Sequence, residues 1–106
     1  MGKAICHHEG MFFEWSTVVD APVTYGMTRE AFEAYYRDEY GRASFEDELP
    51  GRMKRALTKG TSFLGATTLD SLLEFNAECA KGGEIDAYRP TNYEELMKVL
   101  TPPPHS

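Results

Sequence analysis

The sequence predicts an α+β fold that is predominantly helical, with an N-terminal strand, about four helices, and a short second strand or extended connector before the last helix. Three observations predict this class. Apolar and polar residues alternate in one early segment, apolar residues recur at three- and four-residue spacing in later segments, and Gly or Pro separates the segments. Alternation is typical of a strand, the longer spacing of a helix, and Gly and Pro of the breaks between elements.

The alternating segment covers residues 11–19 and predicts the strand. Successive side chains of a strand point to opposite faces, so the odd-numbered residues form its more apolar face. These residues are Met11, Phe13, Trp15, Thr17 and Val19. Pro22 cannot donate a ladder hydrogen bond, and we expect the strand to give way to a loop near Asp20.

The next two helices are predicted over residues 29–40 and 50–59. Thr28 can accept a backbone hydrogen bond at the start of the first helix, and Gly41 can end it. Pro50 breaks the apolar series that follows, so we expect a short turn before it and a helix from it to Lys59. The series recurs every fourth residue and consists of Phe45, Leu49, Met53 and Leu57.

The last two helices are predicted over residues 68–81 and 92–100. Thr67 and Asp70 have the spacing of a capping box before the first, and Thr91 and Glu94 have it before the second. Gly82 and Gly83 end the first helix, and three prolines follow the second. The intervening residues 84–88 form the second strand or connector.

Composition and charge bound the architecture and exclude several classes. We expect a flexible leader over residues 1–10, a single globular domain over 11–101 and a proline-rich tail over 102–106. The net charge of −6 disfavours generic binding to a phosphate backbone, although a local basic patch remains open. Two cysteines are too few for a disulfide scaffold, and no apolar run reaches membrane-spanning length. A soluble cytoplasmic protein is therefore expected.

Helical spacing predicts one shared core, and the strand predicts an unpaired edge. The expected core residues are Phe32, Tyr36, Leu72, Leu73, Leu96 and Leu100. A single strand cannot satisfy both of its backbone edges, so it pairs with residues 84–88, with another chain, or with solvent. Pairing with a second copy would give a homodimer through residues 11–19, and the competing pairing within the chain would leave a monomer.

Two cysteine-containing segments are the first candidates for chemistry. Cys6, His7, His8 and Glu9 offer metal-ligand types in succession, but adjacent side chains rarely close a tetrahedral site and no other cluster completes it. We therefore predict no metal site, and adventitious binding by the leader stays open. Cys79 falls in a leucine-rich helix without a sequence-adjacent base, which favours packing over nucleophilic chemistry.

Charged runs flank Pro50 and give two further candidates. Glu46, Asp47 and Glu48 are expected to be solvated and to support a helix start, because three adjacent carboxylates cannot all face one pocket. Arg52, Arg55 and Lys59 follow the spacing of one helix face and could bind phosphate. The commoner role of such a row is a solvated charged face.

Several segments resemble small accessory proteins carried by actinobacteriophages. They are residues 15–22 (WSTVVDAP), 24–28 (TYGMT), 35–41 (YYRDEYG) and 60–62 (GTS), and the resemblance spans residues 11–75. It implies a small accessory protein made in the cytoplasm of an infected bacterium. It implies no catalytic residue and no particular partner.

The residues favour a noncatalytic protein-interaction module, which could act on a bacterial host protein. No nucleotide-binding glycine loop, zinc-binding spacing or catalytic triad motif is present, so no catalytic residue and no cofactor are predicted and an enzyme is the minority hypothesis. Phe13 and Trp15 are candidate interface anchors, because aromatic side chains often anchor interfaces. The alternative is nucleic-acid association, either through Arg52, Arg55 and Lys59 or by acidic mimicry of a nucleic acid.

Overall fold

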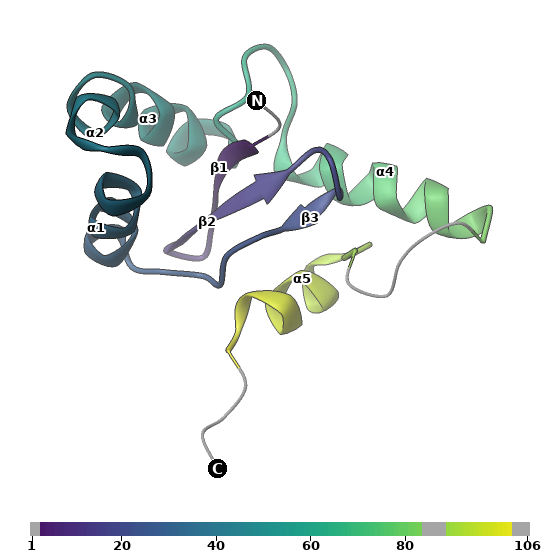
Figure 1. The fold of residues 1–106 in the computed structure, drawn as a ribbon. Coiled ribbons are helices and arrows are strands. Elements are labelled where there is room, and N and C mark those ends of the chain that lie inside the picture. The colour runs from purple at the N-terminus through teal and green to yellow at the C-terminus, as the bar shows by residue number, and fades with distance from the viewer. Residues whose placement is uncertain (1–2, 84–88, 103–106) are drawn as a thin grey trace.

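The computed structural model describes residues 3–83 and 89–102 and confirms the α+β class. A three-stranded antiparallel sheet comes first, and five helices follow within the described residues (Figure 1). In chain order the elements are β1 (Lys3–His8), β2 (Met11–Ser16), β3 (Ala21–Pro22), α1 (Arg29–Tyr40), α2 (Arg42–Asp47), α3 (Leu49–Lys59), α4 (Leu69–Lys81) and α5 (Tyr93–Leu100). The predicted connector 84–88 and residues 103–106 of the predicted tail lie outside the described residues.

The prediction of a flexible leader is wrong for Lys3–His8, which forms β1 and pairs with β2 along its whole length. The two strands are joined by Glu9 and Gly10, which have φ angles of +49° and +80°. Two consecutive residues with positive φ make the tight turn whose twist matches that of a hairpin. The hairpin was not predicted because residues 1–10 are mostly polar. The buried residues of β1 are three consecutive ones, Ala4, Ile5 and Cys6, and they show no alternating pattern.

The predicted strand 11–19 ends earlier than expected and is the central strand of the sheet. β2 stops at Ser16, a turn covers residues 17–20 with Asp20 at a φ of +53°, and β3 then pairs with the end of β2. The other edge of β1 is covered by residues 60–62, where the amide of His7 donates to the carbonyl of Gly60. β2 therefore has partners on both sides within the chain, and the edge argument for a homodimer is wrong.

The sheet lies between α1 and α3 on one side and α4 and α5 on the other (Figure 1). The buried residues form two clusters rather than the one core predicted. On one face, α1 and α3 pack Phe32, Tyr36 and Met53 against Ile5 and Phe12. The other face is covered by α4 and α5, and its buried residues are Cys6, Phe13, Trp15, Leu69, Leu73, Leu96 and Leu100. The predicted core residues are split between the clusters because both faces of β2 are buried, and Leu72 packs only at the edge of the second.

Helix boundaries follow the predicted breaks, with shifts of one residue at two caps. Thr28 caps α1 as predicted, and Gly60 ends α3 in the left-handed conformation. Before α4 the capping box is made by Thr68 and Ser71 rather than by Thr67 and Asp70. Before α5 the cap is Asn92 rather than Thr91.

The segment before Pro50 forms a separate helix, α2, and not a mere turn. Pro50 is tolerated because it lies in the first turn of α3, where an amide has no helical acceptor. Leu57 also differs from expectation, since it is exposed on α3, and Phe75 is likewise exposed on α4.

Candidate interaction site

The chain bows outward between β3 and α1. From the Trp15–Pro22 pair to the Phe12–Met27 bridge, β2 advances three residues while the facing chain advances five. Two extra residues cannot stay in the ladder, so the facing chain bulges away from β2 over residues 23–26. Bulges of this kind occur at sheet edges and beside functional sites, where they redirect side chains.

Specific hydrogen bonds hold the bowed segment in place. The amide of Val23 donates to the carbonyl of Glu14, and the hydroxyl of Thr24 accepts from the amide of Glu14 at 3.0 Å. The amide of Gly26 donates to the carbonyl of Leu100, which ties the segment to the end of α5. A Cβ on Gly26 would meet the sulfur of Met11 at 2.6 Å, so a larger residue here would displace the Met11 side chain. The bow is therefore a fixed part of the fold.

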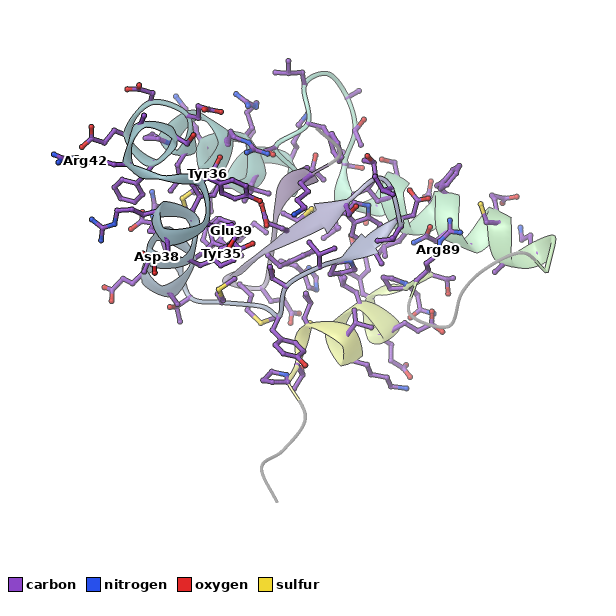
Figure 2. The ribbon with its side chains drawn as sticks, in the orientation of Figure 1. Tyr35, Tyr36, Asp38, Glu39, Arg42 and Arg89 are labelled. Carbon is purple, nitrogen blue, oxygen red and sulfur yellow. The ribbon has the colours of Figure 1, made fainter. Side chains whose placement is uncertain are left out.

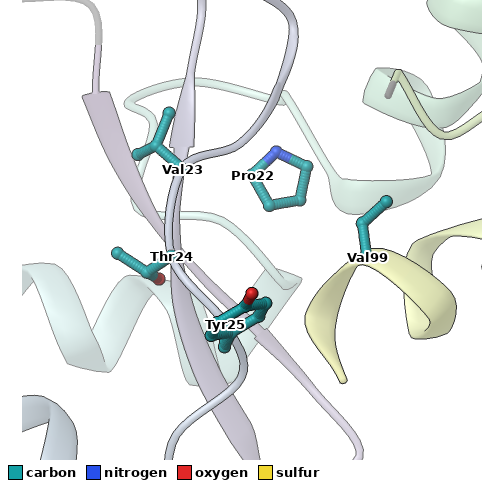
Figure 3. Close-up of a pocket in the computed structure, with 5 residues that line it drawn as sticks. All are labelled: Pro22, Val23, Thr24, Tyr25 and Val99. Atoms are coloured by element: carbon teal, nitrogen blue, oxygen red, sulfur yellow. The ribbon is translucent and has the colours of Figure 1, made fainter. Parts of the chain in front are cut away.

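A hollow of about 350 Å³ lies between the bowed segment and α5. Its lining consists of Pro22, Val23, Thr24, Tyr25 and Val99. Pro22 and Val99 face each other across it, and Tyr25 lies below them in this view (Figure 3). Val23 and Tyr25 are 45% and 51% exposed, so both side chains can be reached from solvent. The hollow is thus an open depression that exposes apolar side chains together with the hydroxyl groups of Thr24 and Tyr25.

The outer edge beside the hollow is protected against strand pairing. β3 contains only two residues, and Pro22 has no amide hydrogen to donate. The amide of Gly26 is already bonded to α5. Short edges and proline are devices that prevent edge-to-edge association, so the hollow favours side-chain contacts over strand addition.

The prediction that Phe13 and Trp15 anchor an interface is wrong, because both side chains are completely buried. They lie on the odd-numbered face of β2, which α4 and α5 cover. The odd-numbered face was correctly predicted to be apolar, but its partner is the chain itself. Within the described residues, the buried Nε1 of Trp15 has no hydrogen-bond acceptor.

The predicted basic row is present on α3, and its members bind carbonyl oxygens of the same chain. Arg52 donates to the carbonyl of Lys3 at 2.9 Å, and Arg55 donates to that of Ser62 at 2.9 Å. Lys59 donates to the carbonyl of Gly65. All three side chains are half-buried, so the row is a fixed surface and not a freely solvated face.

Sequence reasoning missed Glu14, which is the most buried charged residue among those that the structure describes and has no exposed surface. The phenol of Tyr35 donates to one carboxylate oxygen of Glu14 at 2.5 Å, and the phenol of Tyr40 donates to the other at 2.6 Å. Burial, and then the hydrogen bond to Glu14, raises the pKa of each phenol. Alternation placed Glu14 on the polar face of a strand, and nothing in the spacing indicated that α1 would cover that face.

These tyrosines extend a polar network along α1. Figure 2 shows Tyr35 and Tyr36 on α1, beside the sheet. The phenol oxygen of Tyr36 accepts a hydrogen bond from Arg52 at 2.7 Å, so α1 and α3 are joined next to the Glu14 cluster. The carboxylate of Glu14 is enclosed, and the network therefore stabilises the fold rather than contacting solvent.

The Cys6, His7, His8 and Glu9 segment does not gather into one site. Strand alternation places Cys6 in the apolar cluster under α4 and α5, where burial raises the pKa of its thiol. His7 packs on Phe12 on the opposite face, and His8 stacks on Tyr93. No group of three potential metal ligands occurs in the part of the chain that the structure describes.

The remaining candidates occupy helix surfaces. Glu46, Asp47 and Glu48 are exposed at the junction of α2 and α3, where Glu46 pairs with Arg42 at 2.9 Å and Glu48 accepts from Ser44 at 3.1 Å. Cys79 is half-buried on α4. None of these residues lines the hollow.

Sequence reasoning also missed the hollow itself. Val23, Tyr25 and Val99 belong to a loop and to the last helix, and no periodicity links them. The only local signal was the sequence from Pro22 to Gly26, which predicted a loop without showing where it would fold.

Comparisons with models of protein families, with curated proteins and with solved structures gave no match to this chain. Within residues 3–83 and 89–102, each helix is too short or too polar to traverse a bilayer.

Proposed function

We propose that this protein is a noncatalytic protein-interaction module and that its contact site is the hollow between the bowed segment and α5. The observation that carries the proposal is the exposure of Val23 and Tyr25 around an open depression whose backbone is hydrogen-bonded to β2 and to the end of α5. Apolar and aromatic side chains that remain exposed around a concavity are typical of interaction sites.

The chemistry of the lining favours a protein side chain as the occupant. Pro22, Val23 and Val99 supply apolar walls, while Thr24 and Tyr25 supply hydroxyl groups. Among the lining residues described, none carries a carboxylate, an imidazole or a thiol for acid, base or nucleophilic work. A volume of about 350 Å³ is at the small end of ligand sites and fits one or two apolar side chains of a partner.

We propose a different protein as the partner, because the structure removes the strand-pairing argument for a second copy of this chain. Both edges of β2 are paired internally, and Pro22 blunts the edge next to the hollow. The resemblance to actinobacteriophage accessory proteins supports a protein of the bacterial host cytoplasm as the partner. An actinobacterial lysate is therefore the first source to test.

The experiment compares Tyr25→Ser with Phe75→Ser as bait in that lysate. The two aromatic side chains are similarly exposed, at 51% and 54%, but Phe75 lies on α4 and does not line the hollow. We expect a protein that wild type and Phe75→Ser both retain and that Tyr25→Ser loses. With the purified partner, loss of an anchor of this kind should weaken Kd roughly 10- to 30-fold.

Circular dichroism and the unfolding midpoint serve as controls for folding of each variant. If folded Tyr25→Ser retains the same proteins as wild type, the hollow is not the contact site. If the folded wild type retains nothing reproducibly, the proposed function fails.

A further inference from the structure

Apart from Arg37, the cations of this protein fall into two groups that occupy different parts of the fold. Five of them are ion-paired in the described structure, and the pairs are Arg29–Glu33, Arg42–Glu46, Lys81–Glu78, Arg89–Asp20 and Lys98–Glu94. Arg37 lies over the ring of Phe45. The other five have no carboxylate partner among the described residues, and all belong to the start of β1 or to α3: Lys3, Arg52, Lys54, Arg55 and Lys59. We call this set the basic surface.

Carbonyl oxygens hold the basic surface in place without neutralising it. Arg52 reaches the carbonyl of Lys3, which brings the start of β1 beside α3. Arg55 uses only its Nε to bind Ser62, and no described hydrogen bond uses its two terminal nitrogens. Such a free pair of donors can bind two oxygens of one phosphate.

The loop of residues 60–66, which two of these cations bind, also carries an aromatic residue. Arg55 and Lys59 hold the carbonyls of Ser62 and Gly65, and Phe63 lies between these two anchored positions in the chain. Phe63 is half-buried, and its neighbour Leu64 is 80% exposed. Single-stranded nucleic acid is bound by cations that contact its phosphates together with aromatic rings on which its bases stack, and this loop supplies one aromatic ring.

Acidic residues lie at the other end of α3. Asp47 and Glu48 precede the helix, whose 11 residues span about 16 Å at 1.5 Å per residue. Charges separated by more than about 8 Å are largely screened at physiological ionic strength. The field of these carboxylates therefore weakens toward Arg55 and Lys59.

We propose that the basic surface binds single-stranded nucleic acid through its phosphates, with Phe63 as the stacking side chain. A row of cations along a helix suits the regular charges of a nucleic-acid strand. The net charge of −6 disfavours a rigid duplex, which would also bring phosphates near the acidic residues elsewhere on the protein. A flexible single strand can stay on the basic surface alone.

The test is fluorescence anisotropy with a labelled 20-nucleotide single-stranded DNA, titrated with the full chain at several salt concentrations. If all five cations contact phosphates, the logarithm of the binding constant should fall with that of salt with a slope of roughly −3.5. We expect Lys54→Glu to weaken binding several-fold and Lys81→Glu to change it little. Both variants reverse one exposed lysine on a helix, and Lys81 lies on α4, outside the basic surface.

Phe63→Ser adds a second arm and is expected to weaken binding with no change in salt slope. The proposal is overturned by absent binding at low salt, by equal effects of Lys54→Glu and Lys81→Glu, or by tighter binding of a duplex of the same length. Equal competition by poly-L-glutamate would also overturn it and indicate an acidic protein as the partner. Tyr25→Ser should leave DNA binding unchanged, so this proposal and the proposed function can fail separately.

Discussion

The two faces of the sheet are stabilised in different ways. On the face covered by α1 and α3, aromatic rings pack together and a buried carboxylate, Glu14, accepts hydrogen bonds from two phenols. The face covered by α4 and α5 is mainly aliphatic, with Trp15 at its centre. The first face therefore depends on completed hydrogen bonds, whereas the second depends on apolar area and close packing.

Polar contacts on the second face lie at its rim. The side-chain amide of Asn76 donates to the carbonyls of Asp20 and Pro90, each at 2.9 Å, and its oxygen accepts from Arg89 at 3.0 Å. Figure 2 shows Arg89 beside α4, across the sheet from the tyrosines of α1. This set of bonds joins the β2–β3 turn, α4 and the segment before α5. These bonds orient the three segments around the aliphatic cluster, and apolar packing remains the main source of stability on this face.

Removal of Glu14 is expected to give the largest loss of stability. Glu14→Ala leaves two phenols without their acceptor, and hydrogen bonds to a charged group contribute about 1.5 to 3 kcal/mol each. The free energy of unfolding, measured by urea denaturation, should therefore fall by about 3 to 6 kcal/mol. Glu14→Gln keeps the volume and one acceptor oxygen, so its loss should be smaller. A loss below about 1 kcal/mol for Glu14→Ala would show that the phenols do not depend on this carboxylate.

Truncation of Leu73 tests the aliphatic face in the same way. Leu73 is buried in the second cluster, and Leu73→Ala should lower the free energy of unfolding by about 2 to 5 kcal/mol. Leu72→Ala is the matched control, because Leu72 lies at the edge of the same cluster and is only half-buried. Equal losses for the two variants in thermal or urea unfolding would contradict the packing described for α4.

Much of the secondary structure could be predicted because the signals are local. The cap at Thr28 and the stop at Gly41 fix α1, and apolar spacing places α4 and α5 to within a residue. The cap shifts arise because Thr67 and Thr68 are adjacent and both can cap, and the same holds for Thr91 and Asn92. Choosing between such neighbours depends on packing that the sequence does not display.

The candidate site could not be predicted because it depends on contacts between distant segments. Val99 meets the bowed segment only because the carbonyl of Leu100 accepts from Gly26. Phe13 and Trp15 were predicted as exposed anchors because a strand with one apolar face is also what an interface requires. The two alternatives differ only in whether helices of the same chain cover that face, and α4 and α5 do so.

The smallest expected effect is a difference between two tyrosine–carboxylate contacts in how much stability each loses at alkaline pH. Tyr35 binds the buried Glu14, whereas Tyr93 binds Asp70 at the surface of α4. Burial, followed by the hydrogen bond to Asp70, raises the pKa of Tyr93 to about 12. The pKa of Tyr35 is also raised, by burial and then by its bond to Glu14. Each contact therefore contributes stability below pH 10, the ordinary tyrosine pKa, and loses it as the pH rises further.

We expect the free energy of unfolding to fall between pH 10 and pH 12, and Tyr35→Phe to flatten this fall more than Tyr93→Phe. The phenol of Tyr93 can exchange its carboxylate for water, since the residue is 37% exposed, whereas Glu14 has no exposure to water. At pH 7, Tyr93→Phe should change stability by less than about 0.5 kcal/mol, because its ring can still stack on His8. Urea unfolding at half-unit pH steps measures these differences. Lysines titrate in the same pH range, but they do so equally in wild type and in both variants, so the comparison between them is unaffected. A steeper alkaline fall in Tyr35→Phe than in wild type would reverse the assigned direction of its pKa shift.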